Sequence, residues 1–420
     1  MKYQNTLAFA QQLDKEDPLA HLRNQFHIPQ DKNGNEWLYF TGNSLGLQPK
    51  STKKYINQEL EDWANLGVEG HFEAKNPWLN YHEYLTDKMA KIVGAKPIEV
   101  VVMNTLTTNL HLLMVSFYRP TKTKYKIVIE SDAFPSDRYA VQSQLKFHGF
   151  SEDDIIEWKP RKGEELLNIE DLEKIVNNQG DEIALLLIGG VNYYTGQFLD
   201  IKKIAAIGHS KNCMVGIDLA HGAGNIQPNL HDSNVDFAAW CTYKYLNSGP
   251  GSLAGLFVHE KHSKNKDLPR FSGWWNHNKA TRFNMRQPFD VMEGAEGWQL
   301  SNPPILSMSA IKASLDLFDE VGMNALKEKS EKLTGYFEFL INQINSDDIK
   351  IITPKNPKER GCQLSIQVKN ADKSLHKKLT ENNIITDWRE PDVIRCAPVP
   401  MYNSFEDIYR MVSILKKILK

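Results

Sequence analysis

Three short runs with almost no polar residues constrain the fold of this sequence most strongly. They are YKIVIE, IALLLI and MVGID, at Tyr125–Glu130, Ile183–Ile188 and Met214–Asp218. Strands that are apolar on both faces are typical of a parallel sheet with helices on each side. Between the runs, Ile169–Gln179 and Ile201–Lys211 have the apolar spacing of amphipathic helices. Because strands and helices alternate, the sequence predicts βαβ units and an α/β fold.

The pattern changes after the segment SNPP at residues 301–304. A long helical stretch is predicted from Ile305 to about Ser346, with a break near Gly322. Three strands and a closing helix are expected beyond it, at Ile349–Thr353, Cys362–Val368, Val393–Ala397 and Glu406–Leu419. We therefore expect an N-terminal segment (1–50) that packs on both domains, a large α/β domain (51–304), and a linking helix with a small α+β domain (305–420).

The composition is that of an ordinary globular chain of 420 residues, 41% hydrophobic and 24% charged. Its net charge is −2 and it has no long basic block, so nucleic acid is not an expected partner. The N-terminus MKYQNTLAFAQQLDKEDP carries charges where a signal peptide has its apolar core, which predicts a cytosolic protein that does not enter a membrane. The four cysteines form no CxxC pair, so neither a metal site nor a disulfide framework is predicted.

The residues that follow the strands are the first candidates for function, because ligands of parallel sheets bind at the carboxyl ends of the strands. The segment SDAFPSD follows the first run and offers Phe134 and Asp137, and GGVNYYTG follows the second. The third run ends in Asp218, with His221 three residues later. A fourth segment, WCTYKYLNSGPG, places Lys244 between two tyrosines.

Each of these residues has two interpretations. A buried ammonium ion is costly, so a lysine held among aromatic rings could serve as a covalent nucleophile, whereas a lysine at a strand edge could simply reach solvent. Asp218 could cap a turn, Phe134 could belong to the core, and the threonines at 104–108 could be a plain helix N-cap.

Considered together, the candidates fit one ligand. A flat cationic heteroaromatic ring needs an aromatic side chain on one face, a carboxylate at its ring nitrogen and, for a lysine-linked cofactor, a nearby lysine. Phe134, Asp218 and Lys244 supply these groups. Residues 104–108 stand at the start of a predicted helix, where free N–H groups suit a phosphate. The sequence therefore predicts a site for pyridoxal phosphate.

Longer motifs make the resemblance more specific. GNSLGLQPK, NTLTTNLHLLM, FPSDRYA, YYTGQ, DLAHGAGN, YKYLNSGPG, SNPPI and IRCAPVPMYNSFED follow one another along nearly the whole chain and together resemble kynureninases. The resemblance implies a fold-type I pyridoxal phosphate enzyme with a mainly parallel seven-stranded sheet and a homodimer with shared active sites. It implies hydrolysis of L-kynurenine or 3-hydroxy-L-kynurenine to L-alanine and anthranilate or 3-hydroxyanthranilate, in tryptophan degradation and NAD biosynthesis.

The resemblance also implies roles for individual residues. Lys244 would bind the cofactor covalently and move the substrate α-proton, Asp218 would face the pyridine nitrogen, and Tyr243 would move protons in the later steps. The other cofactor positions would be Leu106, Thr107, Phe134, Pro135, Ser136, Asp137, His221, Trp274 and Asn302. The substrate positions would be Ser44, His71, Asn302 and Arg395, with Arg395 binding the α-carboxylate. Trp274 and Asn302 would reach the site of the neighbouring subunit.

Two positions bear on specificity. His71 and Asn302 match positions where kynureninases that favour the 3-hydroxylated substrate carry histidine and asparagine, so we expect that preference here; alternatively, His71 packs against Trp78 or caps a turn. Gly189 stands where the resemblance leads us to expect a serine, and we therefore leave it out of the predicted site.

Other functions are compatible with the same fold. A cysteine desulfurase needs a reactive cysteine on a mobile loop, whereas Cys362 and Cys396 both lie in predicted strands. An aminotransferase would use the same lysine and aspartate. A binding protein that had lost catalysis would not be expected to retain both Lys244 and Arg395.

Overall fold

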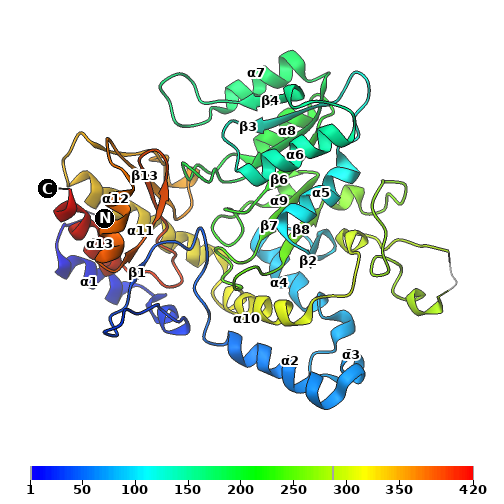
Figure 1. Ribbon diagram of the computed structural model, residues 1–420, viewed down its shortest axis with the longest axis horizontal. Coiled ribbons are helices and arrows are strands. Elements are labelled where there is room, and N and C mark those ends of the chain that lie inside the picture. The colour runs from blue at the N-terminus through cyan, green and yellow to red at the C-terminus, as the bar shows by residue number, and fades with distance from the viewer. Residues whose placement is uncertain (1, 286–287, 420) are drawn as a thin grey trace.

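The computed structural model describes residues 2–285 and 288–419. Its largest element is a seven-stranded sheet with helices packed on both faces (Figure 1). Strands β7, β6, β5, β3 and β4 run parallel, and β8 pairs antiparallel with both β7 and the edge strand β2. In sheet order the strands are β2 (Val100–Met103), β8 (Ala254–Val258), β7 (Phe237–Cys241), β6 (Met214–Asp218), β5 (Ile183–Gly189), β3 (Lys126–Glu130) and β4 (Ile155–Trp158).

Successive side chains of the central strands enter opposite cores. Val128 of β3 packs into the core on one face of the sheet, whereas Ile127 and Ile129 pack into the core on the other face. Leu186 and Leu185 of β5 divide in the same way. Burial on both faces explains why the central positions of these strands are apolar, and it confirms the predicted mainly parallel sheet between helices.

The helices around this sheet are α4 (Glu83–Val93), α5 (Leu106–Phe117), α6 (Pro135–Phe147), α7 (Ile169–Gln179), α8 (Ile201–His209), α9 (Leu230–Ser233) and α10 (Ile305–Val321). The predicted break near Gly322 is confirmed, since Gly322 separates α10 from α11 with a φ of 76°, in the left-handed region that favours glycine. Among the described residues, no helix is both long enough and apolar enough to cross a membrane.

A second, antiparallel sheet forms the core of the C-terminal part, as predicted. Its strands in order are β12 (Asp387–Arg389), β13 (Val393–Cys396), β10 (Leu364–Val368) and β9 (Ile349–Ile351). Helices α1 (Leu7–Glu16), α11 (Met323–Asn342), α12 (Lys373–Glu381) and α13 (Phe405–Ile418) pack with it. The short strand β1 (Leu38–Tyr39) pairs with β11 (Ile384–Ile385) and joins the N-terminal segment to this part. The domain boundaries at residues 50 and 304 stay a prediction.

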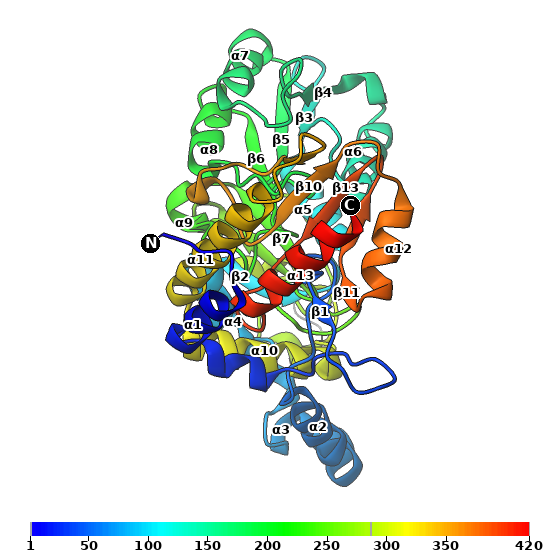
Figure 2. The same ribbon diagram turned by 90° about the vertical axis from the view of Figure 1, so that its left-hand side faces the viewer.

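Two exposed apolar regions lie outside these cores. Helices α2 (Thr52–Leu66) and α3 (Gly70–Glu73) extend away from the body in both views (Figures 1 and 2), and we call residues 52–73 the arm. One side of α2 packs on α10, whereas Trp63 and Val68 of the arm are 61% and 71% exposed. The loop of residues 271–285, which we call the aromatic loop, exposes Phe271, Trp274, Phe283 and Met285.

Candidate active site

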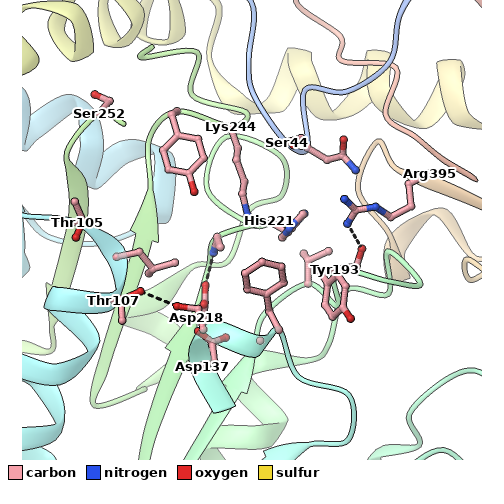
Figure 3. A pocket seen from close by; sticks show the side chains of 18 of the residues that line it. Ser44, Thr105, Thr107, Asp137, Tyr193, Asp218, His221, Lys244, Ser252 and Arg395 are labelled. Atoms are coloured by element: carbon pink, nitrogen blue, oxygen red, sulfur yellow. Dashed lines mark hydrogen bonds between the residues drawn. The ribbon is translucent and has the colours of Figure 1, made fainter. Parts of the chain in front are cut away.

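A cavity of about 510 Å³ opens at the carboxyl ends of the central parallel strands. This is the edge at which the sequence predicted a ligand site. Figure 3 shows Thr107 and Arg395 on opposite sides of it, with Lys244 and His221 between them. The lining residues are Asn43, Ser44, Thr105, Leu106, Thr107, Glu130, Phe134, Ser136, Asp137, Gly189, Val191, Tyr193, Asp218, Ala220, His221, Tyr243, Lys244, Gly251, Ser252, Arg389 and Arg395.

The turn after β7 holds Lys244. The carbonyl of Lys244 accepts a hydrogen bond from the N–H of Asn247 at 3.0 Å, and Asn247 has a φ of 53°, so the chain reverses here toward β8. The N–H of Gly46 donates to the carbonyl of Tyr243 at 2.8 Å, which ties the N-terminal segment to this turn. The side chain of Lys244 points into the cavity (Figure 3). The structure thus places the side chain of Lys244 in the cavity, and its role as a covalent nucleophile stays a prediction.

The ammonium of Lys244 contacts a neutral histidine. Lys244 Nζ lies 3.0 Å from His221 Nε2 and 5.8 Å from the centre of the Phe134 ring. Burial, together with the charge of Lys244, holds the pKa of His221 well below its usual range. A neutral His221 can accept a hydrogen bond from Lys244 through Nε2 and keeps a proton on Nδ1. His221 Nδ1 is inaccessible to solvent and has no hydrogen-bond partner among the described residues.

Asp218, the last residue of β6, places a carboxylate deep in the cavity. It is 7% exposed, and its Oδ1 accepts a hydrogen bond from the N–H of Ala220 at 2.5 Å. Asp137, in the first turn of α6, lies beside it (Figure 3). Burial and the charge of Asp218 raise the pKa of Asp137 well above its usual range, so Asp137 is protonated and donates to Asp218. Burial also raises the pKa of Asp218, whereas the hydrogen bond with Asp137 lowers it.

The amino-terminal ends of two helices meet at the opposite end of the cavity from Arg395. Helix α5 begins at Leu106, and the backbone N–H groups of its first turn have no partner within the helix. Thr107 Oγ1 lies 2.7 Å from the hydroxyl of Ser136 in the first turn of α6. Hydroxyl groups and helix N-termini together form a binding site for an anion such as a phosphate.

Arg395 of β13 brings the C-terminal part of the chain to the cavity. It is 1% exposed, so it is not the surface salt bridge that an isolated arginine suggests. It forms an ion pair with Asp387, and its Nη1 donates to the carbonyl of Tyr193 at 2.6 Å. Arg389 also lines the cavity. Two guanidinium groups and one carboxylate leave this side of the cavity positively charged.

Most of the predicted site residues meet here. Ser44, Leu106, Thr107, Phe134, Ser136, Asp137, Asp218, His221, Tyr243, Lys244 and Arg395 all line the cavity. Pro135 does not line it, and it begins α6. His71, Trp274 and Asn302 also do not line it: His71 is on the arm, Trp274 is in the aromatic loop, and Asn302 is exposed before α10.

The structure adds residues that sequence reasoning missed. Glu130 and Gly189 are the last residues of their strands, and Gly189 lines the cavity although we had left it out. Tyr193 lies in the segment GGVNYYTG, which the sequence marks without singling out this residue, and Arg389 comes from the small sheet, where no local pattern marks it. A charged residue at the end of an apolar run was the only signal available for Glu130.

Comparison with known proteins gives one consistent result. A family model described as the kynureninase C-terminal domain matches residues 326–415. Proteins named kynureninase from Myxococcus xanthus and Flavobacterium psychrophilum are 54% and 56% identical to this chain, over 99% of it and over 97% and 99% of their own lengths. One from Nematostella vectensis is 47% identical, over 98% of this chain and 94% of its own.

Solved structures with lower sequence identity share the fold. A lysine-to-alanine mutant of C-DES, described with glycine covalently linked to its pyridoxal phosphate cofactor, superposes with a TM-score of 0.79 at 17% identity over 94% of this chain and 98% of that one. The cysteine desulfurase CsdA from Escherichia coli superposes with a TM-score of 0.77 at 16% identity, over 96% of this chain and 98% of that one. These similarities show that the chain has fold type I of pyridoxal phosphate enzymes.

Proposed function

The chain belongs to the kynureninase family, and we propose on this basis that its cavity hydrolyses L-kynurenine and 3-hydroxy-L-kynurenine and prefers the latter. It is a pyridoxal phosphate-dependent hydrolase that cleaves a carbon–carbon bond. The observation that supports the cavity as its active site is that Lys244, Asp218 and Arg395 line the same space. A cytosolic role in tryptophan degradation and NAD biosynthesis is part of the proposal.

The residues present fit the cofactor. Buried polar atoms in proteins are normally paired, yet Asp137 Oδ1 and His221 Nδ1 have no partner among the described residues, which indicates a polar ligand. The bound cofactor would withdraw electrons from the substrate carbon next to the amine. Asp218 would keep the ring nitrogen protonated, Phe134 would cover one face of the ring, and the first turn of α5 would bind the phosphate.

Lys244 and Tyr243 would transfer protons to and from the substrate. Lys244 would hold the cofactor covalently, and its free amine would remove the substrate α-proton. Burial, together with the nearby Cys241, raises the pKa of Tyr243 well above its usual range. Tyr243 therefore keeps its proton at neutral pH and can donate it when the bond between Cβ and Cγ breaks.

The positive side of the cavity would bind the substrate carboxylate. Arg395 Nε is inaccessible to solvent and has no hydrogen-bond partner among the described residues. Its guanidinium is held in place by Asp387 and the Tyr193 carbonyl, so little side-chain freedom is lost when a carboxylate binds. Arg389 adds a second positive charge, and Ser44 adds a hydroxyl.

Substrate preference would come from a second subunit. His71 and Asn302 do not line the cavity of their own chain, so their proposed contact with substrate would be made in the cavity of a partner. His71 contacts Trp78 edge to face, as the alternative interpretation expected, and its Nδ1 lies 2.9 Å from the carbonyl of Val68. A carbonyl only accepts hydrogen bonds, so in a neutral ring Nδ1 carries the proton and Nε2 is an acceptor. An acceptor of this kind suits a phenolic hydroxyl.

The exposed apolar residues of the arm support a homodimer. Trp63, Val68 and Phe72 are 61%, 71% and 58% exposed and belong to the same short segment as His71. Trp274 of the aromatic loop is 43% exposed. Apolar surface of this kind is normally covered by a partner. A second copy that covers the arm would bring His71 close to a cavity other than its own.

Kinetics with both substrates test the proposed function. The wild type, loaded with pyridoxal phosphate, should release L-alanine from both kynurenines, with the higher kcat/KM for 3-hydroxykynurenine. In the double variant His71→Trp, Asn302→Thr the preference should fall by about tenfold or more, because a hydroxyl without partners is costly to bury. The exposed His21, outside the cavity and the arm, gives the control His21→Trp. A wild type that prefers kynurenine, or an unchanged ratio in the double variant, would contradict the preference.

The thiols do not support the desulfurase alternative. Cys362 and Cys396 are 1% and 0% exposed. Burial raises the pKa of the Cys362 thiol to about 12 and also raises that of Cys396. A reactive cysteine needs access and a low pKa, and these two residues have neither.

A further inference from the structure

The last residues of three neighbouring strands meet at the end of the cavity that holds Asp218. Strand β3 ends at Glu130, β5 at Gly189 and β6 at Asp218, and β5 lies between the other two in the sheet. Gly189 pairs directly with Asp218 in the strand register. Because Gly189 has no side chain, the middle strand contributes only backbone between the two carboxyl groups.

Glu130 occupies the space that a side chain at position 189 would need. A Cβ atom added to Gly189 would lie 2.7 Å from Glu130 Oε1, closer than Cβ atoms normally approach. Glu130 Oε2 accepts a hydrogen bond from the N–H of Gly189 at 2.7 Å. Oε1 has a contact of 3.5 Å with Asn192 Nδ2, too long for a strong hydrogen bond. A carboxyl group that is 4% exposed and incompletely paired therefore lines the cavity.

Several charged and titratable groups face Glu130. The negative charge of Asp218 on β6 disfavours a second negative charge there, and Glu130 in turn raises the pKa of Asp137 on α6 and that of Tyr193 in the loop after β5. The ammonium of Lys244 lies in the same cavity and lowers the pKa of Asp137. Before the cofactor binds, this end of the cavity therefore holds more acidic groups than it can ionise together.

We propose that Glu130 is a positioning residue for the cofactor, whose carboxylate adds a second negative charge beside Asp218 and so strengthens the hold on the protonated ring nitrogen. This inference rests on the proposed function, because it requires pyridoxal phosphate with its ring nitrogen at Asp218. Gly189 is the residue that makes the arrangement possible, since a larger side chain there would displace the Glu130 carboxylate.

The arrangement makes cofactor affinity depend on pH in a definite direction. Burial and the charge of Asp218 raise the pKa of Glu130 to about 7 in the protein without cofactor. A cationic ring favours the ionised carboxylate, so the pKa of Glu130 is lower in the complex. Between these two values, binding releases a proton and affinity rises with pH. At a pH below both pKa values Glu130 is neutral and does not strengthen cofactor binding. At a pH above both it is ionised and strengthens binding fully.

The test measures the dissociation constant of pyridoxal phosphate, by the absorbance of the bound cofactor, for wild type and Glu130→Gln between about pH 5.5 and about pH 8.5. The amide resembles the neutral acid, so the two proteins should bind alike at the low end. At the high end the variant should bind about tenfold more weakly, which corresponds to one pKa unit of coupling. Glu157→Gln, which removes a carboxylate from the adjacent strand β4 outside the cavity, is the control and should bind like wild type at every pH.

Gly189→Ala provides a second variant that retains the carboxylate but displaces it. In this variant, the affinity for pyridoxal phosphate should rise less with pH than it does in the wild type. A ratio of dissociation constants that does not change with pH in either variant would overturn the inference, because a merely structural role would weaken binding equally at all pH values. If the wild type did not bind pyridoxal phosphate at all, the proposed function itself would fail.

Discussion

The cavity and the arm differ in how their functional residues are held. The cavity side chains Asp218, His221 and Arg395 are between 1% and 7% exposed and are fixed by hydrogen bonds within one chain. His71, on the arm, belongs to a segment that exposes Trp63 and Phe72 to solvent. The cavity of one chain thus holds Lys244, Asp218 and Phe134, whereas His71 lies on an exposed surface that, under the proposed function, a second copy covers.

Lys244→Ala should have the largest effect on the cavity. The change removes both the covalent attachment point and the base, so kcat should fall by at least about 10⁴-fold. The fold should be retained, because the side chain of Lys244 points into the cavity. The rate of alanine release and the melting temperature are the measurements. Lys174→Ala, on the surface of α7, is the matched control and should behave as wild type. If Lys244→Ala released alanine near the wild-type rate, the cavity would not be the active site.

Asp218→Asn should have the next largest effect. An amide keeps the shape but cannot hold the ring nitrogen protonated, so kcat should fall by about 10²- to 10³-fold. Asp236→Asn is an informative control, because Asp236 is also a buried aspartate but pairs with His209, His262 and Lys261 outside the cavity. It should lower the free energy of unfolding by about 3 kcal/mol without changing kcat of the folded enzyme. An Asp218→Asn activity within a few-fold of wild type would mean that its carboxylate only caps the strand.

Substituting the arm should act on assembly. Trp63→Asp with Phe72→Asp places two charges on the exposed apolar surface, so dimerisation should weaken by about tenfold or more, with activity lost in proportion to the dimer. Sedimentation at several protein concentrations gives the dissociation constant. Phe147→Asp, at the end of α6, changes a phenylalanine outside the arm that is 78% exposed, more than Phe72, and should leave assembly unaffected. Unchanged assembly in the arm variant would place the interface elsewhere.

The sequence predicts the cavity better than it predicts the arm, for physical reasons. Asp218 and Lys244 follow strands whose continuous apolar character identifies their position in a parallel sheet, so their meeting can be inferred from the pattern. Glu130 could not be inferred, because its environment depends on the absence of a side chain at Gly189 in a different strand. The role of His71 could not be settled either, since a single chain does not show what covers the arm.

Smaller differences have local causes. The predicted strand Cys362–Val368 begins in the structure at Leu364: the backbone N–H of Cys362 donates to the side chain of Asn225 instead of to a neighbouring strand, and the side-chain amide of Gln363 donates to the carbonyl of Tyr193. Both contacts join the small sheet to loops of the large one. Sequence periodicity does not carry information about such side-chain bonds between distant segments.

A mixture of two inactive or altered subunits tests most directly whether each active site combines one chain's cavity with another chain's arm. Lys244→Ala subunits are mixed, after dissociation, with His71→Trp, Asn302→Thr subunits, and kcat/KM is measured for both substrates. If Lys244 and His71 of one site come from different chains, each mixed dimer contains one fully wild-type site. About a quarter of all sites in an equal mixture should then recover wild-type activity with preference for 3-hydroxykynurenine. A mixture that shows only the preference of the double variant, at its diluted activity, would contradict the account.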